Sequence, residues 1–176
     1  MKANFDLIPF AIDTAPAISI MGEIERQQNQ LTIEYQLTGQ IIIPPTVNNP
    51  TRQFDLWEHT CCEFFLGLKD STQYWEFNLS PAGHWNVYRF LDYRENLLEE
   101  TAFDTLPFEV LQENDNLQLN LKIDLQRIIP PEQSLEVGVT AVIKDRASQL
   151  SYWALTHPGK EADFHDRDAF AIYLDN

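Results

Sequence analysis

Polar side chains recur at alternate positions in the stretch TCCEFFLGLKDSTQYWEFNLSPAGHWNVYRF, residues 60–90. Alternation of this kind predicts that the members of the set share one face of a β-sheet. Carboxyl, amide and phenol groups on one face could exchange hydrogen bonds with several hydroxyl groups of one ligand. The set consists of Glu63, Glu76, Asn78, Asn86 and Tyr88.

A hairpin is predicted at the residues PAG (81–83), because proline and glycine favour a turn there. If Ser80 lies opposite His84, the register also pairs Asn78 with Asn86 and Glu76 with Tyr88. The alternate residues then face the core: Phe77, Leu79, Trp85 and Val87. A slip of one residue would move Trp85 onto the polar face instead.

Two interpretations of this polar face stay open. Antiparallel sheets with one solvated face alternate polar residues outward by default, so the set needs no function. Alternatively, the face binds a sugar, whose hydroxyl groups meet the polar residues while an aromatic ring stacks on the pyranose. The candidate aromatic residues are Trp57, Trp85 and Trp153.

Other residues could support catalysis or metal binding. Glu63 and Glu76 could act as a general acid and base on a glycan, although carboxylates on neighbouring strands reach such separations easily. Cys61 as a nucleophile, with His59 two residues before it, has no identified third member. The chain contains none of the motifs GxSxG, GxGxxG or the Walker loop.

The segment ADFHDRD offers oxygen ligands that could bind calcium, but its spacing is not that of an EF-hand and no glycine breaks it. A solvated acidic turn is the alternative, and we expect no cofactor. The residues concerned are Asp163, His165, Asp166 and Asp168, with His157 nearby.

The rest of the chain predicts mainly strands. In LQLNLKIDL (117–125) leucine and isoleucine alternate with polar residues, which is the period of a half-buried strand. A hairpin is predicted from the strands ISIMGEI and LTIEYQL, with RQQNQ as its loop. Further predicted strands are LEVGVTAVI, SYWAL and AFAIYL. On the last of these, one side carries Phe170, Ile172 and Leu174. DLQRII and LDYRENLLEE could form short helices. About nine to eleven short strands separated by prolines predict an all-β, antiparallel, jelly-roll-like β-sandwich.

Composition limits the partners and the compartment. The chain of 176 residues fits a single domain, residues 1–176. Its 12 basic and 27 acidic residues give a net charge of −15, which disfavours nucleic acid and anionic membranes as partners. Cys61 and Cys62 are adjacent, so a bond between them is geometrically disfavoured and both are expected as free thiols. With no secretory signal or membrane-length apolar stretch, a cytoplasmic protein is expected.

Two segments resemble DOMON-like domains, relatives of the family-nine carbohydrate-binding modules. The resemblance covers roughly residues 17–174. The chain looks most similar to a group of small stand-alone DOMON-like proteins that are common in cyanobacteria. In LWEHTCCEFFLGLKDSTQYWEFNLSPAGHWNVYRF it rests on Trp57, Glu63, Phe64, Phe65, Tyr74, Phe77, Asn78, Pro81 and Gly83. In SYWALTHPGKEADFHDRDAFAIYL it rests on Trp153, Pro158, Phe164 and Phe170.

The resemblance implies a β-sandwich that binds a small molecule or an oligosaccharide and does not catalyse a reaction. Sugar and haem are the ligand classes that it implies. Haem-binding members use a methionine and a histidine as axial ligands, whereas Met1 and Met21 have no recognisable histidine partner here. We therefore expect a non-catalytic carbohydrate-binding protein, with a glycan-acting enzyme and a haem-binding or interaction module as the alternatives.

Overall fold

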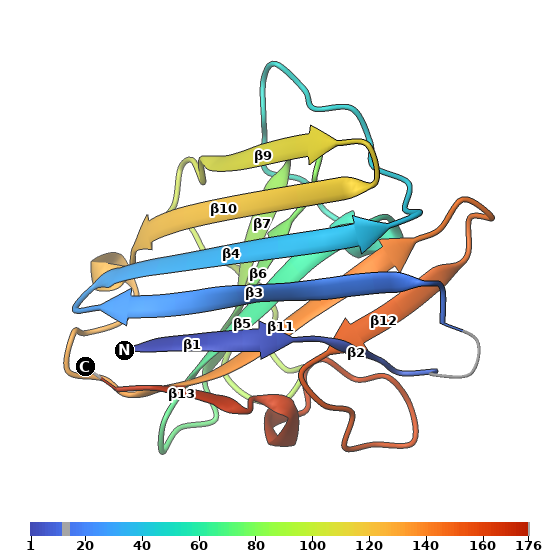
Figure 1. Ribbon diagram of the computed structural model, residues 1–176. Coiled ribbons are helices and arrows are strands. Elements are labelled where there is room, and N and C mark those ends of the chain that lie inside the picture. The colour runs from blue at the N-terminus through green and yellow to red at the C-terminus, as the bar shows by residue number, and fades with distance from the viewer. Residues whose placement is uncertain (12–14, 176) are drawn as a thin grey trace.

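The computed structural model of the chain describes residues 1–11 and 15–175, and it consists of two antiparallel β-sheets packed face to face (Figure 1). The smaller sheet has the strand order β1–β3–β4–β10–β9. Its strands are β1 (Lys2–Asp6), β3 (Ile18–Gln27), β4 (Gln30–Gly39), β9 (Phe108–Glu113) and β10 (Asn116–Asp124). The expected hairpin of ISIMGEI and LTIEYQL is confirmed, since β3 pairs with β4 along their whole length, but its loop is shorter than RQQNQ because β3 extends to Gln27 and β4 begins at Gln30.

The larger sheet lies behind the smaller one in Figure 1, and its strands cross those of the front sheet obliquely. Its order is β2–β12–β11–β5–β6–β7–β8, and β13 also pairs with β11. These strands are β2 (Ile8–Pro9), β5 (Cys61–Leu68), β6 (Tyr74–Leu79), β7 (Trp85–Phe90), β8 (Leu98–Glu99), β11 (Leu135–Lys144), β12 (Leu150–Ala154) and β13 (Ile172–Leu174). The expected all-β antiparallel sandwich is confirmed.

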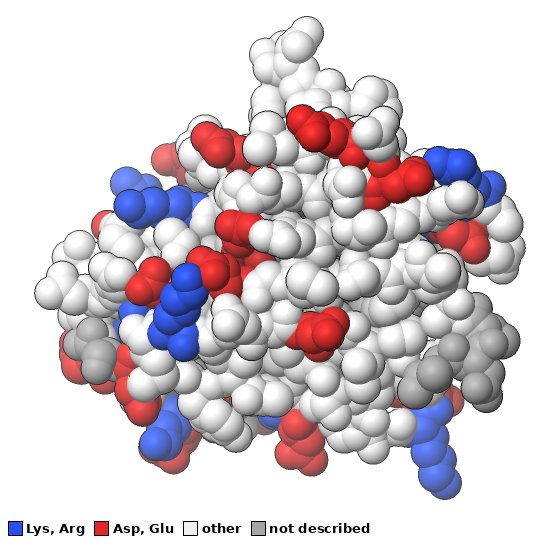
Figure 2. Space-filling view, viewed as in Figure 1, with Lys and Arg blue, Asp and Glu red and all other residues white. Residues whose placement is uncertain are grey.

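Alternating residues build the core between the sheets. On β10, Leu117, Leu119, Leu121 and Ile123 are buried, as the period of two predicts. Leu125 is also buried, but it begins the 3₁₀ helix η3 (Leu125–Arg127), which confirms a short helical piece at this point. Carboxylates are scattered over the outer face of the small sheet, and arginine and lysine lie among them (Figure 2).

Two expectations about local structure are wrong. Residues 91–100 form no helix: a loop returns the chain from β7 to β8, with Arg94 and Asn96 in left-handed backbone conformations at φ of 53° and 54°. Phe170 does not share the core side with Ile172 and Leu174, because it lies in the turn before β13 and packs on the outer face of the large sheet. No helix in the described part of the chain is long and apolar enough to cross a membrane.

Candidate functional site

The outer face of the large sheet carries the predicted polar set. The register is the predicted one: β6 and β7 pair Glu76 with Tyr88 and Asn78 with Asn86, and β5 and β6 pair Glu63 with Asn78. The intervening side chains Phe77, Leu79 and Trp85 enter the core. All five polar residues are buried, however, so this face is not a solvated sheet surface.

One end of the set is closed by a neighbouring segment. The Oδ1 of Asn86 accepts a hydrogen bond of 2.8 Å from Arg52, and its Nδ2 donates to the carbonyl oxygen of Gln53 at 2.9 Å and to the Tyr88 hydroxyl at 2.8 Å. The rings of Trp57 and Phe54 lie 6.1 and 6.4 Å from that of Tyr88. Asn86 and Tyr88 therefore support the sheet and its covering segment, and neither lines the open part of the face.

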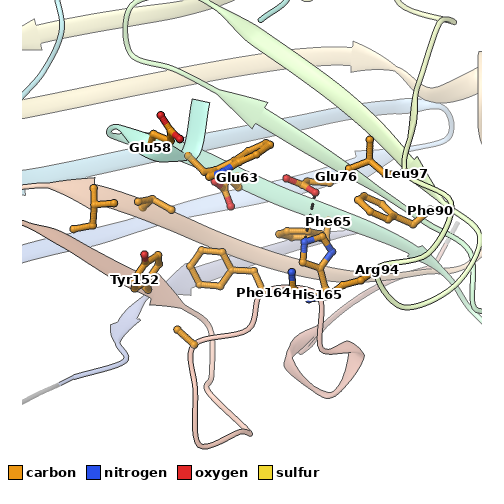
Figure 3. A pocket seen from close by; sticks show the side chains of 14 residues that line it. Glu58, Glu63, Phe65, Glu76, Phe90, Arg94, Leu97, Tyr152, Phe164 and His165 are labelled. Atoms are coloured by element: carbon orange, nitrogen blue, oxygen red, sulfur yellow. Dashed lines mark ion pairs between the residues drawn. The ribbon is translucent and has the colours of Figure 1, made fainter. Parts of the chain in front are cut away.

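The other end of the set opens into a cavity of about 570 Å³. Glu63 and Glu76 lie together in it, and side chains from four other segments form its walls (Figure 3). The walls are mostly apolar or aromatic. The remaining residues that line the cavity are Trp57, Glu58, Phe65, Phe90, Arg94, Leu97, Val142, Leu150, Tyr152, Ala162, Phe164 and His165.

Burial changes the protonation of both carboxyl groups. Desolvation raises the pKa of Glu76 to about 7, although the 2.7 Å hydrogen bond from Asn78 Nδ2 to its Oε1 acts in the opposite direction. Desolvation also raises the pKa of Glu63, and the neighbouring charge of Glu76 adds to this effect. Glu63 receives one long contact, 3.4 Å from the Thr140 hydroxyl to its Oε2. Near neutral pH Glu76 is therefore partly protonated, and Glu63 keeps its proton to a higher pH than an ordinary carboxyl group does.

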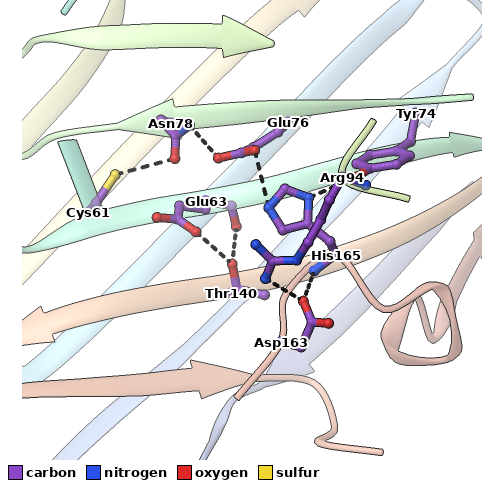
Figure 4. A network of polar contacts seen from close by, with 9 residues as sticks. All are labelled: Cys61, Glu63, Tyr74, Glu76, Asn78, Arg94, Thr140, Asp163 and His165. Atoms are coloured by element: carbon purple, nitrogen blue, oxygen red, sulfur yellow. Dashed lines mark hydrogen bonds and ion pairs between the residues drawn. The ribbon is translucent and has the colours of Figure 1, made fainter. Parts of the chain in front are cut away.

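His165 reaches this face from the loop that follows β12 (Figure 4). Its Nδ1 lies 2.9 Å from the Tyr74 hydroxyl, and its Nε2 lies 3.8 Å from Glu76 Oε2. The Tyr74 oxygen also accepts the backbone N–H of Arg94 at 3.1 Å, so Tyr74 joins His165 to the loop that carries Arg94. Burial, with Arg94 nearby, lowers the pKa of His165 to about 4, so the ring is neutral at pH 7.

Two glycines let this loop approach the sheet. A Cβ atom on Gly138 would lie 2.9 Å from the Phe170 ring, and one on Gly67 would collide with the Arg167 guanidinium. Arg167 donates to the Leu68 carbonyl oxygen at 3.2 Å and forms an ion pair with Glu136. These contacts anchor the short helix η4 (Arg167–Ala169) directly after His165 and so hold the imidazole over Glu76.

Arg94 comes from the loop between β7 and β8, on the opposite wall. Its guanidinium lies 2.7 Å from Asp163 Oδ1, and the same oxygen accepts the backbone N–H of His165 at 3.0 Å. Although burial disfavours the charged carboxylate, hydrogen bonds from Tyr93, Arg94 and His165 lower the pKa of Asp163. Asp163 therefore ties the two loops together, and its charge offsets that of Arg94.

The three tryptophans considered for stacking lie in different environments. Trp57, on η2 (Leu56–Glu58), lines the cavity and is 37% exposed. Trp85 and Trp153 are both 3% exposed and belong to the core between the sheets. Arg52 lies over the Trp85 ring, 4.4 Å from its centroid. Of the three, only Trp57 offers surface to a ligand in the cavity.

The residues considered as a nucleophile or as metal ligands occupy positions typical of residues that support the fold. Cys61 and Cys62 are free and buried on opposite faces of β5; burial raises the pKa of both thiols, and Cys61 contacts Asn78 Oδ1 at 3.8 Å. Asp166 caps η4 by accepting the Asp168 N–H at 3.0 Å. Within residues 1–11 and 15–175, no group of three or more histidine, cysteine or acidic side chains could hold a metal ion.

Several cavity residues were not predicted as site residues. Phe164 lies in the segment interpreted as an acidic turn, where His165 was considered only in connection with calcium; Arg94 lies within the stretch interpreted as a possible helix, and Phe90 directly precedes it. Tyr152 belongs to a correctly predicted strand. The alternation along that strand separates its two faces, but it does not show which face borders a cavity. No local pattern marks these residues, because loops that cross the sheet bring them together.

No protein-family model and no curated protein sequence matches the chain. Among solved structures, the chain is similar to a protein of Bacteroides uniformis to which carbohydrate binding has been ascribed. The TM-score is 0.71 at 11% identity, over 96% of this chain and 83% of that one.

Two further similar structures are of a family-nine carbohydrate-binding module from Caldicellulosiruptor kristjanssonii, one in complex with glucose and one with cellotriose. Their TM-scores are 0.51 and 0.50 at 9% and 10% identity, over 84% of this chain and 71% and 70% of those chains. At these identities the likeness establishes the fold: the chain has the β-sandwich fold found in a family-nine carbohydrate-binding module.

Proposed function

We propose that this chain is a non-catalytic carbohydrate-binding protein and that the cavity over β5 and β6 is its binding site. The observation that carries the proposal is the presence, in one cavity, of the exposed ring of Trp57 and the paired carboxyl groups of Glu63 and Glu76. A volume of about 570 Å³ lies within the usual range for small-ligand sites.

The chemistry of the cavity suits a sugar. A pyranose has an apolar face that can pack on Trp57, and its hydroxyl groups can donate to or accept from carboxyl groups in either protonation state. The glucose and cellotriose complexes of similarly folded modules support this ligand class. Each hydrogen bond to a neutral sugar contributes about 1 kcal/mol net, so the affinity should be modest.

Replacing Trp57 with alanine tests the site. Titration of the wild-type protein with cellotriose should change its tryptophan fluorescence, because the other three tryptophans, Trp75, Trp85 and Trp153, are buried. Trp57→Ala should weaken binding about tenfold, since it removes the stacking surface. Trp57→Phe keeps an aromatic ring and should retain most of the affinity. Equal affinities for the wild type and Trp57→Ala would contradict this position for the ligand.

A glycan-acting enzyme is the second candidate, because a carboxyl group with a pKa of about 7, as in Glu76, suits a general acid. Glycoside hydrolysis also requires an ionised partner, and burial raises the pKa of Glu63 as well. Release of reducing sugar from cellotriose that stops in Glu76→Gln would establish the enzyme. Binding without release supports the proposed binding protein.

A further inference from the structure

The cavity contains an excess of acidic groups. Three of its lining residues are glutamates, Glu58, Glu63 and Glu76, whereas its basic residues are Arg94 and His165. Asp163 offsets the charge of Arg94 at 2.7 Å, and burial keeps His165 neutral at pH 7. Among the described residues that line the cavity, Arg94 is therefore the one charged cation; it lowers the pKa of Glu76, but Asp163 offsets part of its charge.

One carboxyl oxygen of Glu63 also lacks a hydrogen-bond donor. The residue is 2% exposed, and its Oε1 has no partner anywhere in the described part of the chain. The contact between Thr140 and Oε2, at 3.4 Å, is long for a hydroxyl donor. Buried carboxyl oxygens are normally paired, and Glu63 lines the cavity, so a rotation of its enclosed carboxyl group toward a ligand there would give this oxygen a donor.

The aromatic walls of the cavity and the net charge of the protein also favour a cationic ligand. The rings of Trp57, Phe90, Tyr152 and Phe164 line the cavity, and the faces of aromatic rings attract ammonium groups. The net charge of −15 would draw a cationic ligand toward the protein. A neutral sugar would use the aromatic surface but would bring no positive charge to the carboxyl groups.

We propose that the ligand is an amino sugar or an oligosaccharide of amino sugars, and that its protonated amine binds to the carboxyl groups of Glu63 and Glu76. This inference rests on the proposed carbohydrate-binding function and specifies its ligand class. An ammonium N–H group supplies a donor to the unpaired carboxyl oxygen of Glu63, while the pyranose packs on Trp57.

Binding of the amine should release a proton. Burial raises the pKa of both glutamates, so a carboxyl O–H bond breaks when the ammonium binds, its proton passes to solvent, and the carboxylate accepts an ammonium N–H. Affinity should therefore be highest near pH 7, because the carboxyl groups keep their protons at lower pH and the weakly basic amine of an amino sugar loses its own at higher pH. The titratable or charged groups around the pair are Glu58, Cys61, Tyr74, Tyr88, Arg94, Asp163 and His165.

Three β-1,4-linked trimers that differ at C2 test the proposal: cellotriose has a hydroxyl group, the glucosamine trimer an amine, and the N-acetylglucosamine trimer a neutral acetamide. In calorimetry at pH 7, the glucosamine trimer should bind the wild-type protein at least about tenfold more tightly than either other trimer, because charge-assisted hydrogen bonds are the stronger kind. Titration in two buffers of different ionisation enthalpy should show proton release with this trimer alone.

Glu63→Gln should abolish the advantage of the amine, because glutamine keeps the size of the side chain and removes its charge. The matched control is Glu113→Gln, which removes an exposed carboxylate from β9 of the other sheet and should keep the advantage. Cellotriose binding as tightly as the glucosamine trimer would overturn this inference and leave the proposed function standing. An advantage that persists in Glu63→Gln would also overturn it. If no trimer binds, the proposed function itself is wrong.

Discussion

Replacing Leu121 with aspartate should remove more than about 4 kcal/mol from the free energy of unfolding. Leu121 is 2% exposed at the middle of β10, where its side chain enters the core between the two sheets. Aspartate would leave an unpaired charge there, because the surrounding side chains are apolar. A loss of this size is comparable with the total stability of many domains, so the variant should be largely unfolded at 25 °C.

Urea unfolding monitored by circular dichroism measures this effect. The control is Lys122→Asp, which introduces the same side chain one position later on the exposed face of β10. That variant should change the free energy of unfolding by about 0.5 kcal/mol or less. If Leu121→Asp unfolds at the same urea concentration as Lys122→Asp, β10 does not face the core of a sandwich.

The Glu76→Gln variant should be more stable than the wild type at pH 8, by about 3 kcal/mol, and equal to it near pH 4.5. Burial raises the pKa of Glu76 from an ordinary value of 4.5 to about 7 in the folded protein. A raised pKa stabilises the fold while the group is protonated, and this contribution is lost as the pH rises through 7. Glutamine does not titrate, and it can still accept the hydrogen bond from Asn78.

Thermal unfolding of both proteins from pH 4.5 to pH 8 gives the comparison. Glu113→Gln, on the exposed face of β9, should follow the wild type across the whole range. A difference between Glu76→Gln and the wild type that does not change with pH would show that Glu76 stays ionised in the folded protein. The proton release proposed for amine binding would then lose its basis.

The strands that carry the site follow from local patterns. Strict alternation predicts both faces of β6 and β7, and the turn at residues 81–83 sets their register, so the pairing of Glu76 with Tyr88 was predictable. The exposure of these side chains was not predictable. Alternation separates the two faces of a sheet, but it does not show whether another segment of the chain covers one of them. Asn86 is covered by the segment that contains Arg52 and Gln53, whereas Glu76 faces the cavity.

The walls of the cavity depend on contacts between segments distant in the chain. Asp163 joins its own loop to Arg94, 69 residues earlier, and Gly138 leaves room for Phe170 on the outer face of the sheet. Such contacts leave no periodic pattern in the local sequence that could predict them. Similarly, a tryptophan can pack in a hydrophobic core or stack on a sugar. Only the three-dimensional structure shows that Trp85 and Trp153 are buried whereas Trp57 is partly exposed.

A crystal structure with a bound trimer tests the central claim most directly. The protein should be crystallised with whichever of the three trimers binds most tightly in solution, at a saturating concentration. We predict one pyranose against the Trp57 ring, with a hydroxyl or amine group within hydrogen-bond distance of Glu63 or Glu76. A trimer ordered elsewhere on the protein, or a cavity without sugar at saturation, would contradict carbohydrate binding at this site.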